Sequence, residues 1–127
     1  MSDDVVQWLQ FSDEDLRSAA SLLQEGRYRP VGTFCQQAIE KRLKAVIVHR
    51  TGRIPPRSHD LLDLAELAGF ECEEAIERFL AGLTRDYLDG RYPRVDGVFP
   101  LCTDWAQARR TLTATREVLE WPDQLLK

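Results

Sequence analysis

The chain has 127 residues, a net charge of −4, and 43% hydrophobic and 30% charged residues, a composition typical of soluble globular proteins. This length predicts one domain spanning residues 1–127, large enough to fold without metal or disulfide staples. No apolar run approaches the ~20 residues that a membrane helix needs, and the acidic start MSDD leads to no hydrophobic signal region. We therefore expect a cytoplasmic protein that makes no contact with membranes.

The cysteines and histidines exclude the usual metal and disulfide frameworks. Cys35, Cys72 and Cys102 are odd in number, widely separated and without a Cys-x-x-Cys pair. The chain has only two histidines, so no set of residues has the spacing of a metal site. We expect reduced cysteines that pack as small apolar side chains, and no bound metal.

The first two predicted helices are long. Apolar residues recur at spacings of three and four from 5 to 23, which is the pattern of one helix face, and Gly26 follows as a stop signal. Pro30 is a suitable first-turn residue for the next helix. Its apolar stripe continues to a stop at Thr51 and Gly52. These segments predict two amphipathic helices joined by a short connection.

The third predicted helix is short and follows a loop. In the sequence GRIPPRS, the adjacent prolines Pro55 and Pro56 forbid a helix. Ser58 is a suitable N-cap, and Gly69 is a suitable stop. His59 would then directly follow the cap, so that its backbone N–H contributes to the positive helix end, which favours anions.

Two further helices complete the prediction. One is expected from 73 to 88, and the loop DGRYPRVDGVFP follows it. The last is expected to start at a Thr103 cap, to turn apolar residues including Trp105 inward, and to close at Pro122. No segment alternates with the period of two that a strand needs. The predicted fold class is all-α, an antiparallel up-and-down bundle of four long helices plus one short helix.

One stretch of this acidic chain is strongly basic. Residues 41–59 include six lysines and arginines but no aspartate or glutamate. Arginine binds phosphate in a bidentate way, so the cluster is a candidate anion site. A solvated charged face is the alternative. The six residues are Lys41, Arg42, Lys44, Arg50, Arg53 and Arg57.

A polar stripe accompanies the apolar stripe of the second helix. It consists of Gln37, Glu40, Lys41 and Lys44, which follow one another at helical spacing. One interpretation is a solvated face that carries a Glu40–Lys44 ion pair. The other is a surface that faces a ligand or a partner.

Three motifs occur in a fixed order along the chain. FCQQAIEKRLKAVIVHRTG covers 34–52, HDLLDL begins at His59, and RYP covers 91–93. In this order they resemble the HEPN family (higher eukaryotes and prokaryotes nucleotide-binding domain). The N-terminal stretch DLRSAASLLQEGRY also fits the first helix of that family. The resemblance extends over most of the chain as far as Pro93.

The resemblance implies a helical bundle that forms a homodimer. It also implies a partner, a small nucleotidyltransferase encoded as a separate chain, in two-gene modules that resemble toxin–antitoxin pairs. Trp8, Trp105 and Trp121 are more tryptophans than a core of this size requires, which supports an interface.

Many members of the family are ribonucleases, whose motif is an arginine, four to six residues and a histidine on a helix near the dimer interface. Here no histidine follows Arg85 or Arg91. Arg53 and His59 have the right spacing, but they are separated by a proline-rich loop. We therefore expect a non-catalytic, dimeric module.

We predict that this module binds a nucleotide such as ATP, or RNA, and has no resident cofactor. Lysine and arginine would contact phosphate, and Tyr92 would stack on a base or accept a transferred adenylate. Asp60 has an alternative role in capping its helix, and Arg91 has one in holding its loop. The predicted ligand-binding residues are Lys41, Lys44, His59, Asp60, Arg91 and Tyr92.

Two other functions stay open from the sequence. In a ribonuclease, Arg53 would stabilise the charge of the phosphorane and His59 would move a proton, so these two would be the catalytic residues. Alternatively, His59 packs its ring on the bundle and bonds a backbone carbonyl. A purely structural interaction scaffold would bind a partner and show neither a ligand response nor cleavage.

Overall fold

The computed structural model describes residues 1–89 and 102–127, and within them it contains five helices and no strand. This confirms the predicted all-α class with four long helices and one short helix. The helices are α1 (Asp3–Gln24), α2 (Arg29–Thr51), α3 (Leu61–Ala68), α4 (Glu74–Asp89) and α5 (Trp105–Leu125).

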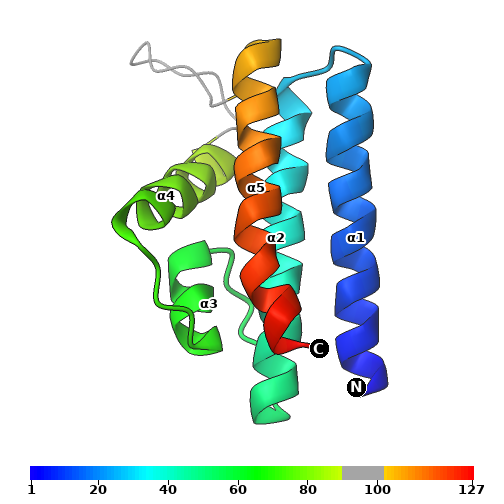
Figure 1. Ribbon diagram of the computed structural model, residues 1–127, viewed down its shortest axis with the longest axis vertical. Helices are drawn as coiled ribbons and strands as arrows, with labels where there is room; N and C mark the ends of the chain where they lie inside the picture. The colour runs from blue at the N-terminus through cyan, green and yellow to red at the C-terminus, as the bar shows by residue number, and fades with distance from the viewer. Residues whose placement is uncertain (90–101) are drawn as a thin grey trace.

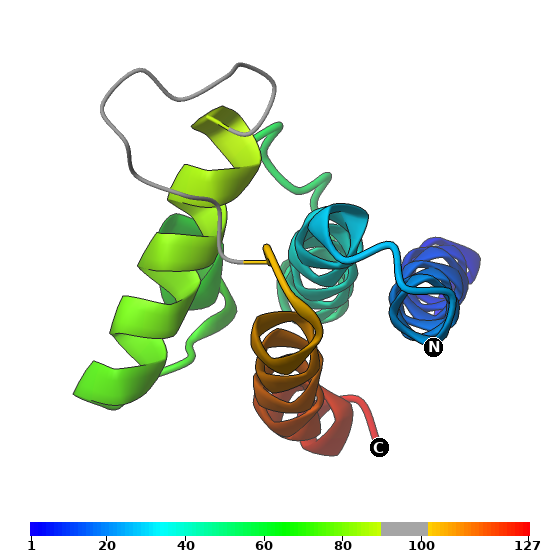
Figure 2. The same cartoon turned by 90° about the horizontal axis from the view of Figure 1, so that it is seen from above.

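α2 is the central helix of the bundle. It packs against each of the other four helices, with α1 on one side and α3 and α4 on the other (Figures 1 and 2). Figure 1 shows by colour that α1 ascends whereas α2 and α5 descend, and Figures 1 and 2 show that α4 lies across these three helices. The predicted helical bundle is therefore confirmed; α4 lies obliquely across it, and α5 runs parallel to α2.

The core surrounds α2 and explains its central position. Each fully buried leucine or isoleucine contributes about 1.5–3 kcal/mol relative to an exposed one. α2 brings the largest share of these side chains, and α3, α4 and α5 each add two, whereas α1 contributes buried Val5 and Ala19. The largest buried side chains from α2, α3 and α4 are Ile39, Leu43, Leu61, Leu64, Leu80 and Leu83.

The predicted cap of α3 is wrong by two residues. The N-cap is Asp60, whose carboxylate accepts hydrogen bonds from the N–H groups of Leu62 (3.0 Å) and Asp63 (3.3 Å). A carboxylate can satisfy both donors and adds a negative charge at the positive helix end. The Ser58 hydroxyl instead accepts a hydrogen bond from the Asp60 N–H, so it forms the turn that leads into the cap.

The start of α5 also differs from the prediction. Asp104 is its N-cap and accepts from the Gln107 N–H at 2.8 Å, while Thr103 contacts the Gln107 side chain. Trp105 is half exposed because it shares a helix face with Arg109, whose guanidinium lies 5.3 Å from the ring centre. Pro122 lies inside α5 rather than closing it, since its buried ring is held by core packing.

The other two tryptophans are engaged within the chain. Trp121 stacks on Phe70 with ring centres 4.2 Å apart, and Trp8 lies beside Lys44. Both are partly buried against the core. Trp105 is therefore the one tryptophan that is half exposed.

The three cysteines are free, and two of them are buried as predicted. Burial raises the pKa of the Cys35 thiol to about 12 and also raises the pKa of Cys102. Both thiols are therefore protonated and unreactive at neutral pH. Among the described residues, no group of three His, Cys, Asp or Glu side chains could hold a metal ion.

None of the helices in the described ranges has the length and apolar character needed to cross a membrane.

Candidate functional site

The six cations of the basic segment 41–59 are divided between the interior and the surface. Arg42 is the most deeply engaged, with 5% of its surface exposed. Its Nε lies 3.0 Å from the Ser12 hydroxyl, and its two terminal nitrogens bind the carboxylates of Asp13 and Asp123. It therefore ties α2 to both α1 and α5.

Two further cations of this segment also make contacts within the protein. The Lys41 ammonium forms an ion pair with Asp15 of α1 and lies 5.6 Å from the centre of the Phe11 ring. Arg50 donates a hydrogen bond to the carbonyl of Ala68 at 2.6 Å. It thereby satisfies a carbonyl at the C-terminal end of α3, where positive charge is stabilising.

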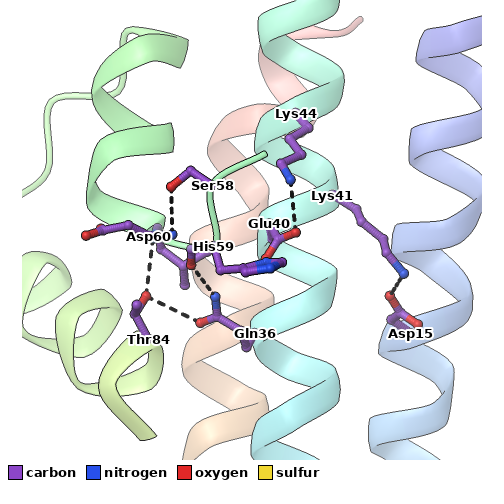
Figure 3. Close-up of polar contacts among 10 residues, drawn as sticks. Asp15, Gln36, Glu40, Lys41, Lys44, Ser58, His59, Asp60 and Thr84 are labelled. Atoms are coloured by element: carbon purple, nitrogen blue, oxygen red, sulfur yellow. Dashed lines mark hydrogen bonds and ion pairs between the residues drawn. The ribbon is translucent and has the colours of Figure 1, made fainter. Parts of the chain in front are cut away.

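Lys44 and Glu40 form a buried ion pair that extends to His59. The Lys44 Nζ lies 3.1 Å from Glu40 Oε2, and the His59 Nδ1 lies 2.8 Å from Glu40 Oε1 (Figure 3). Lys44 and Glu40 are only 6% and 7% exposed. The interpretation of the polar stripe as a solvated face is therefore wrong for these two residues, although the predicted pair itself is confirmed. Lys44 also lies 5.7 Å from the ring of Trp8, so α1 covers it.

The backbone around His59 is held by a second set of polar contacts. Gln36 is fully buried and donates to the His59 carbonyl at 2.7 Å. The Leu61 N–H donates to the Thr84 hydroxyl at 3.2 Å, and that hydroxyl donates to the Gln36 side chain at 3.4 Å (Figure 3). α2, the start of α3 and α4 are thus joined at one point.

His59 itself precedes the cap of α3, which corrects the prediction that its N–H contributes to the positive helix end. Its ring is 49% exposed and bonds Glu40 rather than a backbone carbonyl. A carboxylate only accepts hydrogen bonds, so Nδ1 carries the proton and, in a neutral ring, Nε2 is left as an acceptor. The ring also lies beside Tyr87, with centres 5.8 Å apart.

Arg53 and Arg57 are the exposed cations of the segment. Within residues 1–89 and 102–127, neither guanidinium forms a hydrogen bond or an ion pair. Arg53 lies two residues after Thr51, the last residue of α2, whereas His59 lies beside Glu40, eleven positions before Thr51. At 1.5 Å per residue, the loop therefore runs back along α2 by about 16 Å. Arg53 and His59 lie at its two ends.

The predicted ligand-binding residues are only partly brought together. Lys44, His59 and Asp60 lie at the junction of α2 with the start of α3, whereas Lys41 points toward α1 (Figure 3). Arg91 and Tyr92 lie outside the described residues, as does the rest of the third motif. Their role in ligand binding stays a prediction.

Two supporting residues of this junction, Gln36 and Thr84, were not predicted from the sequence. Gln36, Glu40 and Lys44 follow one another at a spacing of four, so they form one line on α2. That spacing is a signal that could have identified Gln36 in place of Gln37. Thr84 carries no such signal, because it comes from a helix that the chain reaches much later.

Comparisons with known proteins agree with this fold. A family model described as "HEPN domain" matches residues 5–125. The solved structure of TT1696 from Thermus thermophilus is similar, with 22% identity, a TM-score of 0.75, and coverage of 98% of this chain and 99% of that chain. ST0689, described as an archaeal HEPN homologue, has 24% identity, a TM-score of 0.72, and coverage of 97% and 98%. No curated protein sequence matches this chain.

Proposed function

The chain belongs to the HEPN family, and we propose that it is a non-catalytic, dimeric, cytoplasmic module that binds a nucleotide at the start of α3. The nucleotide is either free or carried by a separate small nucleotidyltransferase, with which the module forms a toxin–antitoxin-like pair. The observation that carries the binding proposal is the anchored, half-exposed ring of His59, which follows an exposed arginine, Arg57, by two positions in the loop.

The chemistry of this junction suits a phosphate. The Arg57 guanidinium, which has no partner among the described residues, can bind two phosphate oxygens at once. The His59 ring is held by Glu40 through Nδ1 and is 49% exposed, so Nε2 is the ring nitrogen that remains for a ligand. Lys44 offsets the charge of Glu40, so that this carboxylate repels an incoming phosphate less.

Lys41 and Lys44 stay predicted ligand residues, but their ion pairs limit how they can act. Both ammonium groups already face carboxylates, and Lys44 is almost fully buried. A direct contact with phosphate would require those pairs to open. Arg57 and His59 are therefore the positions at which the proposal is best tested.

The absence of catalysis is supported by the placement of the arginine–histidine pair. Catalysis needs both groups on one phosphate, yet Arg53 and His59 lie at opposite ends of a loop that runs back along α2. The chain has no histidine after His59, so α4 and α5 offer no alternative pair.

The nucleotide proposal is tested by the melting temperature of the protein with and without ATP. At ten times Kd, linkage predicts a stabilisation of about 1.4 kcal/mol, or about 5 °C for a domain of this size. The shift should fall in Arg57→Ala and His59→Ala. Arg78→Ala is the matched control, because it removes an exposed arginine that pairs with Glu74 on α4. An unchanged melting temperature of the wild type at millimolar ATP contradicts the proposal.

A second candidate function, a ribonuclease, is favoured by the hydrogen bond between Glu40 and His59. A carboxylate that orients a histidine is a common arrangement for a general base. The test is RNA cleavage by wild type, Arg53→Ala and His59→Ala, prepared identically. Cleavage lost in both variants would establish these two as catalytic residues, whereas equal or absent cleavage would leave the binding module.

The partner is tested separately from the ligand. The proposal predicts that a small nucleotidyltransferase is encoded beside this chain, and that co-expression of the two yields a complex that survives purification. A structural scaffold, the remaining alternative, would bind such a partner yet show no ATP shift and no cleavage.

A further inference from the structure

Ile54 is the most exposed of the large hydrophobic side chains in the described residues. It is 94% exposed and lies between Arg53 and two prolines. Pro55 is buried, so it anchors the loop, and the two prolines restrict its backbone. Such a segment loses little conformational freedom on binding, which favours association.

A groove between α3 and α4 has the complementary chemistry. It encloses about 590 Å³. Its inner lining is apolar, and three exposed carboxylates surround it. The Arg50 guanidinium, which bonds the Ala68 carbonyl, lies against Gly69 at one edge, so the carboxylates still outnumber the cations beside the groove. The stacking of Phe70 on Trp121 supports the floor. The floor includes Leu62, Ala65 and Phe70, and the rim consists of Glu66, Glu71 and Glu77.

The negative charge around the groove affects a thiol that lines it. Cys72 also lines the groove, and its thiol pKa is raised by partial burial and by the carboxylate of Glu77. A segment that fills this groove should therefore combine an apolar side chain with a positive charge. Ile54 and Arg53 are such a combination.

The loop and the groove lie at the same end of the molecule. Arg50, in the last turn of α2, bonds the carbonyl of Ala68 at the end of α3. Arg53 follows three residues after Arg50, and Gly69 of the groove directly follows Ala68. Ile54 does not enter the groove of its own chain, because it is almost fully exposed. Two neighbouring complementary patches permit a reciprocal contact about a twofold axis.

We propose that Ile54 and Arg53 of one copy dock into the groove between α3 and α4 of a second copy, and the reverse, so that two such contacts form the dimer. This inference rests on the dimer in the proposed function and names its surface. Arg57 and His59 lie toward the other end of the loop and remain open to ligand. The first end of the loop therefore serves assembly and the second serves binding.

The interface is tested by sedimentation velocity at tens of micromolar together with the reactivity of Cys72. Ile54→Glu places a carboxylate opposite the acidic rim and should convert the dimer to a monomer. Val6→Glu is the matched control, because it makes the same kind of change at an exposed position on α1, on the other side of α2. Circular dichroism checks that both variants keep their helices.

Cys72 reports on the groove directly, because Cys35 and Cys102 are buried and their thiols are protonated. In the wild type, modification of Cys72 by a small thiol reagent should slow several-fold as protein concentration rises into the dimeric range. In Ile54→Glu the rate should not depend on concentration.

Three results would contradict the proposed interface, and they differ in whether they also contradict the proposed dimer. If Ile54→Glu remains a dimer, or Cys72 reacts equally fast in monomer and dimer, the proposed dimer stands but uses another surface. If the wild type is a monomer, both the interface and the dimer are lost. The ATP shift is measured independently, so none of these results decides the nucleotide proposal.

Discussion

α2 and the loop that follows it carry the same kind of side chain but use it in different ways. On α2, Arg42 and Lys44 are almost fully buried, and each faces at least one carboxylate. In the loop, Arg53 and Arg57 are exposed and have no ion-pair partner within the described residues. The two groups are separated by fewer than ten residues, yet one stabilises the bundle and the other is free to contact a ligand or a second copy.

The difference follows from what covers each segment. α2 is surrounded by four helices, so a buried cation on it must meet a carboxylate, from a neighbouring helix or from α2 itself, or remain unpaired at high cost. The loop is covered on one side only, and its cations keep their hydration. A local cluster of charge therefore does not define one site, and substitutions should separate its two halves.

The largest effect is expected at Arg42. Arg42→Ala removes three hydrogen bonds that join α1, α2 and α5, together with a buried side-chain stem. We expect a loss of about 3 kcal/mol in the free energy of unfolding, measured by urea denaturation. A loss as small as that of Arg57→Ala would break the comparison between buried and exposed cations.

A somewhat smaller loss is expected at Lys44. Lys44→Ala leaves Glu40 buried with only His59 as a partner, which should cost about 2 kcal/mol. The double variant Glu40→Gln with Lys44→Met removes both charges while keeping their volume, and should recover most of that stability. If the double variant is less stable than Lys44→Ala, the ion pair makes a net contribution to stability. The expectation is instead that each charge only offsets the cost of burying the other.

An intermediate loss of stability is expected at Asp60, and it tests which residue marks the start of α3. Asp60→Ala removes the acceptor for two backbone N–H groups and should cost about 1 kcal/mol in thermal or urea unfolding. Asp60→Asn keeps the cap and serves as the control. Ser58→Ala should cost less than Asp60→Ala, and the reverse order would restore Ser58 as the cap.

The smallest effect on stability is expected in the loop. Arg57→Ala should change the free energy of unfolding by less than about 0.5 kcal/mol, because its side chain is exposed and unpaired among the described residues. The same variant should reduce the ATP-induced rise in melting temperature. A stability loss comparable to that of Lys44→Ala would place Arg57 with the structural cations of α2.

Local features of the fold could be read from the sequence. Gly52 and Gly69 end α2 and α3 with φ values of 67° and 84°, a conformation that glycine adopts without strain. The apolar periodicity placed the helices correctly, and three ordered motifs indicated the HEPN family before any fold was known. The errors at Ser58 and Thr103 are also local, because each lies one or two residues before an aspartate that caps better.

The sequence by itself determined the helices, their approximate ends and the family, because periodicity, glycine stops and motif spacing involve residues close together in the chain. Only the tertiary structure decided which cations are structural. Arg42 meets Asp123 across 81 positions, and Lys41 meets Asp15 across 26. Nothing in residues 41–59 encodes those encounters, since they exist only once α1 and α5 have packed on α2.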